Sequence, residues 1–403
     1  MLTPRRPTLA ILFVTVFVDL LGFGIVIPLL PYYARTFQAS GLTAGAVIAC
    51  YSAMQFVFAP LWGRLSDRIG RRPVMLMSLA TSTLSYALFA GATDLTMLFA
   101  SRVLAGVGGA NVAVAQAFIA DVTGEHERAK GMGLIGAAFG LGFVFGPAIG
   151  GLLAAYGHWA PGAAAALICG LNLLAAVFRL PESLAVARRR RAGFVHPLLQ
   201  LRRVRGRPQL GVLLVAFCAA IFSFATMETT FSLLCATSLH LTATQIYWLF
   251  GYMGLTMSVV QGGIIGRLAQ HVSERALVTG GCVLLALGLL ATPFARPLVP
   301  LLLALAALAI GQGVVSPTLS SLISKTADAA EHGGVLGLSQ ATGSLARILG
   351  PLWGGLLFDW GGPLGPYLTT GTLMLLVTGL SLRLTRAQAA ALTAPNPLAA
   401  RAC

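Results

Sequence analysis

Charged residues are scarce in this chain: 10% of its 403 residues are Asp, Glu, Lys or Arg, and only 12 are acidic. Soluble domains carry about a quarter charged residues, so this composition excludes a surface made for water. The six cysteines include no C-x-x-C pair and no cluster with histidine, which excludes a disulfide framework and a zinc site. The 47 glycines and 20 prolines follow no collagen period and form no polar low-complexity tract, so a fibre and a disordered chain are excluded as well.

Apolar residues, in contrast, make up 57% of the chain. They fall into repeated runs of roughly 20 residues, which is the length of an α-helix that crosses a bilayer. Twelve runs are separated by charged or turn-rich breaks, from residues 9–30 at the start to residues 365–384 at the end. This pattern predicts an all-α integral membrane protein with 12 transmembrane helices and with both termini on the same side.

The formal net charge of +15 is concentrated in a few segments. Nine arginines lie within residues 179–207, and four lie within residues 64–72. With twelve spans, these segments and the termini share one side of the membrane, which the positive-inside rule makes the cytoplasmic side. The basic excess is therefore an orientation signal, and no nucleic acid partner is expected.

An internal repeat divides the chain into two parts. Residues 146–153 (GPAIGGLL) recur 204 residues later as 350–357 (GPLWGGLL), and Gly-Arg-Leu at 63–65 recurs at 266–268. Parallel repeats of this kind build transporters with a binding site at the membrane midplane, between two pseudo-symmetric halves. The predicted organisation is a six-helix half at 1–180, a basic cytoplasmic linker at 181–208, a second six-helix half at 209–384 and a cytoplasmic tail at 385–403.

Residues 63–73 (GRLSDRIGRRP) predict a short cytoplasmic loop between two membrane helices. Gly70 permits a tight turn, and Pro73 suits the first turn of the next helix. Asp67 stands among four arginines, so it can form charge-assisted hydrogen bonds or cap a helix. Such a cluster can lock one conformation and release in another, although a plain positive-inside loop would also contain four arginines. The candidate gating residues are Gly63, Asp67, Arg68, Gly70, Arg71 and Arg72.

The apolar run 131–155 carries small residues at intervals of four. Glycines at such spacing let a second helix approach closely, and a proline bends a helix by removing one backbone hydrogen bond. The candidate packing residues are Gly142, Gly146, Pro147, Gly150 and Gly151. Ordinary membrane packing would produce the same pattern.

These motifs resemble those of the major facilitator superfamily. Residues 63–73 are similar to its signature loop G-x-L-a-D-r-x-G-r-r, and Arg102 with Gly106 resembles its R-x-x-x-G element. Residues 142–151 resemble the motif of the drug/proton antiporter branch, as does the pattern from Asp19 to Pro31. Residues 51–60 (YSAMQFVFAP) look like the tetracycline exporter subgroup.

The resemblance implies a proton-coupled exporter of lipophilic drugs or metabolites, working by alternating access in a bacterial-type inner membrane. Its partners would be a small lipophilic substrate, protons and the lipid bilayer. It implies a monomer that uses the proton gradient, without a cofactor, a metal or catalytic residues.

Three charged residues at membrane depth are candidates for proton coupling: Asp19, Glu228 and Arg102. Carboxylates within membrane spans are costly and are by default functional candidates. Asp19 lies about 15 Å into its span at the helical rise, and Arg102 lies at a similar depth. The two can therefore pair, either as a proton or cation site tuned by the arginine or as a static ion pair. Glu228 lies near the outer third of its span, as a proton or substrate site or as a residue of a watery vestibule.

Several other polar or adaptable residues at membrane depth are candidates for a substrate cavity. They are Gln55, Asn111, Gln116, Phe224, Met227, Gln340 and Arg347. Arg347 can bind an anion or neutralise a carboxylate, with a structural pairing as the alternative. Hydrogen bonds between helices and plain apolar packing would account for the others equally well.

The chain also differs from the tetracycline exporters. They carry an acidic residue within the third helix, but the run 74–92 has none, and the run 244–265 has no histidine. These differences argue against tetracycline itself and leave proton-driven export of another lipophilic molecule. A proton-coupled importer or facilitator of a small metabolite is the alternative, and a receptor or scaffold with this fold is an alternative of another class. No convergent nucleophile, acid/base or metal group is present at membrane depth, so an enzyme is not expected.

Overall fold

The computed structural model describes residues 6–109, 112–123, 125–184, 208–326 and 332–393. Within these residues every regular element is a helix, as the sequence predicts. The first group comprises α1 Arg6–Val26, η1 Ile27–Leu29, α2 Leu30–Thr36, α3 Gly41–Ile69, α4 Arg71–Ala90, α5 Leu95–Gly109, α6 Val112–Val122, α7 Glu125–Ala154 and α8 Trp159–Arg179. The second group comprises α9 Pro208–Ser238, α10 Ala243–Val259, η4 Val260–Ile264, α11 Ile265–His271, α12 Glu274–Ala291, η5 Thr292–Phe294, α13 Leu298–Lys325, α14 His332–Gly361 and α15 Leu364–Thr393.

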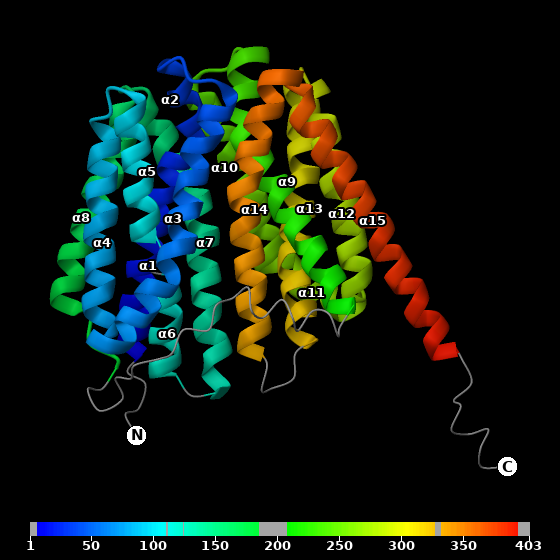
Figure 1. The fold of residues 1–403 in the computed structure, drawn as a ribbon, viewed down its shortest axis with the longest axis horizontal. Helices are drawn as coiled ribbons and strands as arrows, with labels where there is room; N and C mark the ends of the chain where they lie inside the picture. Colours follow the sequence, from blue (N-terminus) through cyan, green and yellow to red (C-terminus); the bar gives the residue numbers. More distant parts are fainter. Residues whose placement is uncertain (1–5, 110–111, 124, 185–207, 327–331, 394–403) are drawn as a thin grey trace.

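The two groups of helices lie side by side (Figure 1). In the first group α1 packs on α7 and α8, and α4 packs on α5 and α8. In the second group α9 packs on α14, and α12 packs on α13 and α15. Between the groups α3 lies along α14, and α7 lies along α10. The helices that carry the sequence repeat therefore form the contact between the groups. The boundaries predicted at residues 180 and 208 and the separate tail at 385–403 stay predictions.

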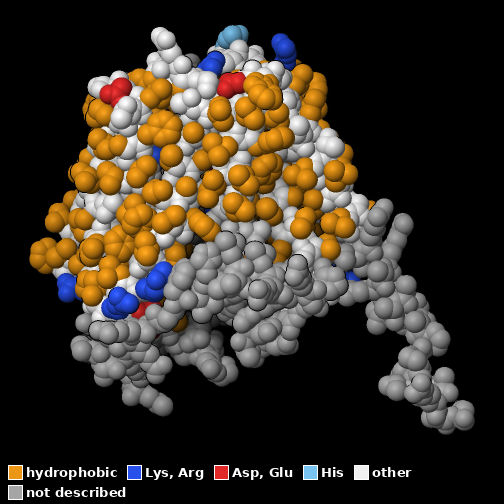
Figure 2. Space-filling view, viewed as in Figure 1, with side chains coloured by type: hydrophobic (Ala, Val, Ile, Leu, Met, Phe, Trp, Pro, Cys, Tyr) orange, Lys and Arg blue, Asp and Glu red, His pale blue; other side chains and the backbone are white. Residues whose placement is uncertain are grey.

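The described residues contain nine helices that are long and apolar enough to cross a membrane. Alongside these nine run α7, α14 and α15, each 30 residues long. The number of twelve spans stays a prediction. Hydrophobic side chains cover most of the middle of the molecule in Figure 2, while charged side chains gather mainly towards its two ends.

The two ends of the bundle differ in charge and are named here by their residues. The basic face is the end where α3 meets α4 and where Arg68, Arg72, Arg179 and Lys325 lie. The opposite face is the end where α3 begins at Gly41 and α14 ends at Gly361. Helix starts on the opposite face are capped by side chains: Ser40 accepts a hydrogen bond from Thr43 N at 3.1 Å, and Thr242 forms a capping box with Gln245.

The predicted loop at residues 63–73 is wrong in its extent. Helix α3 continues through residues 63–68 to Ile69, and α4 begins at Arg71, so Gly70 alone separates them. Gly70 has a φ of +113°, a conformation that favours glycine. The preceding segment stays helical because it contains no helix breaker after Gly63, and Asp67 pairs with Arg71 one turn later. Polar residues at a membrane surface resemble a loop in composition even where the helix extends beyond the bilayer.

Candidate functional site

A cavity of about 800 Å³ lies between the two groups of helices. Its wall is mostly apolar and aromatic, with contributions from α1, α3, α5, α6, α7, α9, α13 and α14. The polar residues in the wall are Tyr51, Ser52, Gln55, Arg64, Arg102, Gln116, Glu228, Gln312, Ser316, Ser320, Gln340, Ser344 and Arg347. A large apolar chamber with a few convergent polar groups is the usual form of a small-molecule site.

Arg102 lines this cavity from α5 and is only 1% exposed. Its guanidinium carbon lies 5.1 Å from the centre of the Phe89 ring and 5.9 Å from that of Tyr86. Nε donates a hydrogen bond to Ser101 Oγ at 3.2 Å, while Nη2 is buried without a hydrogen-bond partner. Cation–π contacts hold the charge in place, but they leave one donor group unsatisfied.

Glu228 on α9 and Arg347 on α14 line the cavity from the second group of helices. Each lies close enough to the other to feel its charge, but within the described residues they form no ion pair. Arg347 Nη2 donates to Ser344 Oγ at 3.3 Å. Tyr51 of α3 lies within electrostatic reach of Arg347, Arg102 and Asp19. Ionisable groups from both halves of the chain therefore lie near one tyrosine.

Asp19 on α1 is buried, at 6% exposure, and does not form part of the cavity wall. It lies behind the wall, close enough to Tyr51 and Tyr86 to affect both electrostatically. The sequence allows a pairing of Asp19 with Arg102, but no ion pair joins these two described residues. Their similar predicted depth is consistent with their common neighbours Tyr51 and Tyr86.

Most of the other predicted cavity residues do line the cavity. They are Gln55, Gln116, Phe224 and Gln340, and Gln55 Nε2 donates a hydrogen bond to Gly109 O at 2.9 Å. Asn111 lies outside the described residues.

The prediction for Met227 is wrong. It is 1% exposed and packs in the apolar core, because on α9 Phe224 and Glu228, four residues apart, share the face that points to the cavity.

Gln312 of α13 is a cavity residue that the sequence reasoning missed. It is 6% exposed, and its Oε1 is buried without a hydrogen-bond partner. The available signal was an amide side chain in the middle of an apolar run of 28 helical residues.

On the opposite face a contact joins the two groups of helices. Asp359, near the end of α14, accepts hydrogen bonds from Gly41 N at 2.6 Å and from Leu42 N at 2.9 Å. These are the first two N–H groups of α3, which have no partner within their own helix. The backbones meet here as well, since an added Cβ at Gly41 would lie 2.7 Å from Gly355 O. We refer to this contact as the Asp359 latch.

The glycines of residues 142–151 let α7 approach two other helices. Gly142 and Gly146 lie against α1, where an added Cβ at Gly146 would lie 2.6 Å from Gly24 Cα. Gly150 lies against the ring of Tyr247 from α10, whose hydroxyl donates to Ile25 O at 2.7 Å. The predicted close packing is therefore present, and it includes a residue from the other group of helices.

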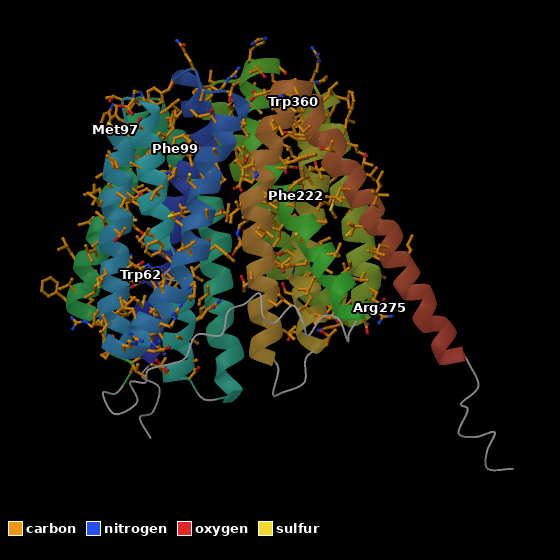
Figure 3. The ribbon with its side chains drawn as sticks, viewed as in Figure 1. Trp62, Met97, Phe99, Phe222, Arg275 and Trp360 are labelled. Carbon is orange, nitrogen blue, oxygen red and sulfur yellow. The ribbon has the colours of Figure 1, made fainter. Side chains whose placement is uncertain are left out.

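The second copy of this motif packs in the same way. An added Cβ at Gly350 would lie 2.8 Å from Phe222 O on α9, and Thr226 donates to Gly350 O at 3.0 Å. Figure 3 shows Phe222 midway along α9, beside α14. In each copy, the helix that carries the motif therefore packs closely on the first helix of its own group, α7 on α1 and α14 on α9.

The charged cluster on the basic face is larger than the sequence suggests. Arg71 forms ion pairs with Asp67 at 2.6 Å and with Asp121, at the end of α6, at 2.9 Å. Glu182, just after α8, accepts hydrogen bonds from the backbone N of Arg71 at 2.8 Å and of Arg72 at 3.3 Å. Neither Asp121 nor Glu182 was predicted, because both lie far from residues 63–73 in the sequence, one at the end of α6 and the other just after α8. Arg68 is exposed, and an added Cβ at Gly63 would meet no other atom.

Comparisons with known proteins identify relatives of this chain among membrane transporters and resistance proteins. The sequence pattern of the Major Facilitator Superfamily matches residues 12–265 and 229–401. The class C tetracycline resistance protein of Escherichia coli is 35% identical over 84% of this chain and 86% of its own length. Multidrug resistance protein 2 of Bacillus subtilis is 28% identical over 94% of this chain and 95% of its own length. The crystal structure of the human organic anion transporter MFSD10 (TETRAN) has a TM-score of 0.71 and 29% identity, covering 94% of this chain and 99% of that one.

Proposed function

The chain belongs to the major facilitator superfamily and is a multi-pass membrane transporter, and on that premise we propose that it exports lipophilic drugs or metabolites in exchange for protons. The basic face would lie in the cytoplasm of a bacterial-type inner membrane, with both termini on that side. The observation that carries the proposal is the cavity between the two groups of helices, which contains ionisable groups at membrane depth and is closed on one side by the Asp359 latch.

The wall of the cavity suits a lipophilic substrate taken up from the cytoplasmic side. Phe23, Phe143 and Phe224 give it an adaptable aromatic surface, and Phe23 lies 4.9 Å from Tyr51 between ring centres. Arg64 and Ser320 extend the lining towards the basic face. With that face in the cytoplasm, the structure corresponds to a state that is closed to the outside. Rocking of the two groups about the cavity would expose it to the other side.

Glu228 is the proposed site of proton coupling. It is the carboxylate of the described cavity wall, and it lies near Arg347 without forming an ion pair. Protonation from the outside neutralises Glu228 in an apolar chamber, which removes the main cost of moving that group through the membrane. Substrate and proton then alternate on the same set of residues. Asp19, buried behind Tyr51, is the second proposed coupling carboxylate.

The latch and the basic cluster are the proposed gates. In the present state Asp359 ties α14 to α3 across the two groups. On the basic face Arg71 is paired within the first group, with Asp67 and Asp121. Opening to the outside requires the latch to break, which frees two backbone N–H groups for water.

Export is tested by expressing the chain in an efflux-deficient bacterium and measuring growth on a panel of lipophilic drugs, including tetracycline. The wild-type protein should protect against one or more compounds, and Glu228→Gln should remove that protection at equal expression. Asp94→Asn is the matched control, because Asp94 is an exposed carboxylate outside the cavity that caps Met97 N at 2.8 Å.

Coupling is tested separately in everted membrane vesicles with the compound that gives resistance. Glu228→Gln should abolish uptake driven by a proton gradient and retain exchange of labelled for unlabelled substrate. Full gradient-driven uptake by Glu228→Gln would contradict coupling at this residue, and protection by no variant against any compound would contradict drug export.

A further inference from the structure

The charges in the cavity wall are unequal in sign. Of the described residues that line it at membrane depth, Arg102 and Arg347 are cationic, and Glu228 is anionic. Ionisable side chains at membrane depth normally pair with one another, so an excess of arginine in such a chamber calls for a negative partner from elsewhere.

Arg102 provides the clearest sign of a missing partner. It is 99% buried, and its Nη2 has no hydrogen-bond partner although it belongs to the cavity wall. The rings of Phe89 and Tyr86 attract its charge but do not accept its N–H group in the plane of the guanidinium. Buried donors of charged groups are rarely left unsatisfied. The described carboxylates do not supply the partner, because none forms an ion pair with Arg102.

Arg347 is in a similar position on the other side of the cavity. Within the described residues its one side-chain hydrogen bond goes to Ser344 Oγ, a neutral acceptor. Tyr51 lies within electrostatic reach of both Arg102 and Arg347, and its hydroxyl accepts a bond from Gln55 Nε2 at 3.4 Å. The surroundings of Tyr51 therefore combine two guanidinium groups with a neutral donor, which is the usual environment of a bound carboxylate or sulfonate.

We propose that the cavity selects lipophilic molecules that carry an acidic group, and that Arg102 and Arg347 bind this group beside Tyr51. This selectivity rests on the proposed function, in which the same cavity holds the transported molecule. The apolar body of the molecule would lie on Phe23, Phe143 and Phe224, which line the cavity. A lipophilic cation would meet the same aromatic surface but an unfavourable field.

The proposal is tested by binding rather than transport, so that it can fail independently of export. The purified protein is placed in nanodiscs and titrated by calorimetry with three probes that share one apolar body: naphthalene sulfonate, naphthalene methanol and naphthylmethylammonium. Empty nanodiscs provide the partition background. The sulfonate should bind at least about tenfold more tightly than the alcohol, because one hydrogen bond to a charged group contributes that much affinity. The ammonium should bind most weakly.

Three variants identify the residues. Arg347→Gln should remove the preference for the sulfonate, and Arg347→Lys should restore part of it. Glu228→Gln should increase sulfonate affinity, because it removes the repelling carboxylate; a merely damaged cavity would not bind more tightly. Arg296→Gln, which removes the same charge from the exposed opposite face, should leave all three affinities unchanged. Arg102→Gln should also remove the preference for the sulfonate, provided that size-exclusion chromatography shows a folded protein. If Arg102→Gln does not fold, the result with Arg347→Gln alone decides whether the cavity selects anions.

The outcomes separate the two proposals. Tighter binding of the ammonium than of the sulfonate, or equal loss of all three probes in Arg347→Gln, would overturn anion selectivity. Sulfonate binding that depends on Arg347, together with no drug export by cells, would retain the selectivity and overturn the proposed export.

Discussion

Removing the Asp359 carboxylate tests how the opposite face is held closed. Its two oxygens accept hydrogen bonds from the first two N–H groups of α3, at 2.6 and 2.9 Å. This is a helix cap supplied by the other half of the chain, so its free energy acts on the equilibrium between the closed and open states. We therefore expect Asp359→Ala to favour the state open to the opposite face.

The magnitude follows from the chemistry of a cap. Replacing a capping side chain by alanine costs about 0.5–2 kcal/mol, and the exposed position of Asp359 keeps the additional charge–dipole term at the low end, about 0.3 kcal/mol. A middle value of about 1.4 kcal/mol corresponds to a tenfold change in the ratio of the two states. Asp359→Asn keeps an acceptor oxygen, so its effect should be smaller.

The assay measures the rate at which a cavity residue is reached from outside. Ser316→Cys places a thiol in the cavity wall, in a background where Cys50, Cys218 and Cys403 are replaced by serine. A membrane-impermeant maleimide is added to right-side-out vesicles. Because the labelling rate is proportional to the population of the open state, Asp359→Ala should raise it about tenfold.

A control variant separates the latch from helix capping in general. Asp94→Ala removes another exposed cap on the opposite face, one that bonds Met97 N within the first group of helices. Its labelling rate should stay at the wild-type value. An unchanged rate in Asp359→Ala with folded protein would refute the reasoning, and would mean that the close approach of Gly41 and Gly355 is enough to hold the face closed.

Three further substitutions test other contacts. Tyr247→Phe removes the hydroxyl bonded to Ile25 O at 2.7 Å, a loss of about 1 kcal/mol, so maleimide labelling should become about fivefold faster. Gly146→Val forces a side chain against the backbone of Gly24 and should destabilise the protein by about 1–3 kcal/mol, seen as a lower melting temperature in detergent than for Gly146→Ala. Glu182→Ala uncaps the first N–H groups of α4 at about 0.5–2 kcal/mol; an unchanged melting temperature would show that water replaces this cap.

The packing of the helices could be predicted from local sequence because it depends on small residues at fixed spacing. Gly142, Gly146 and Gly150 lie where an added Cβ would meet α1 or α10, as four-residue spacing predicts. The face of each apolar helix was harder to predict. Met227 lies one residue from Glu228 yet points into the core, since a helix rotates about 100° per residue and a uniformly apolar run does not reveal which side meets a cavity.

The Asp359 latch could not be predicted because its partners are 318 residues apart. Asp359 stands at the end of an apolar run, where an acidic residue is ordinary, and Gly41 stands at the start of another. Only the packing of α3 along α14 brings them together. The same applies to Glu182 and the start of α4, so the contacts that join separate segments are the part of the site that the sequence leaves open.

The internal repeat shows how the fold and the function are divided between residues. At an offset of 204 residues the two copies share the glycines at 146 and 350 and at 150 and 354, and each copy packs on the first helix of its group. The charged residues at membrane depth are not shared: Asp19 corresponds to Ser223, Glu228 to Gly24 and Arg347 to Phe143. Symmetric positions therefore build two similar halves, and asymmetric ones place a carboxylate and two arginines at a single cavity. This division predicts that exchanging Glu228 and Gly24 lowers the melting temperature in detergent well below that of Glu228→Gly alone, because a side chain at position 24 would meet the backbone of Gly142 and Gly146. Equal melting temperatures of the two variants would contradict the structural role of the shared glycines.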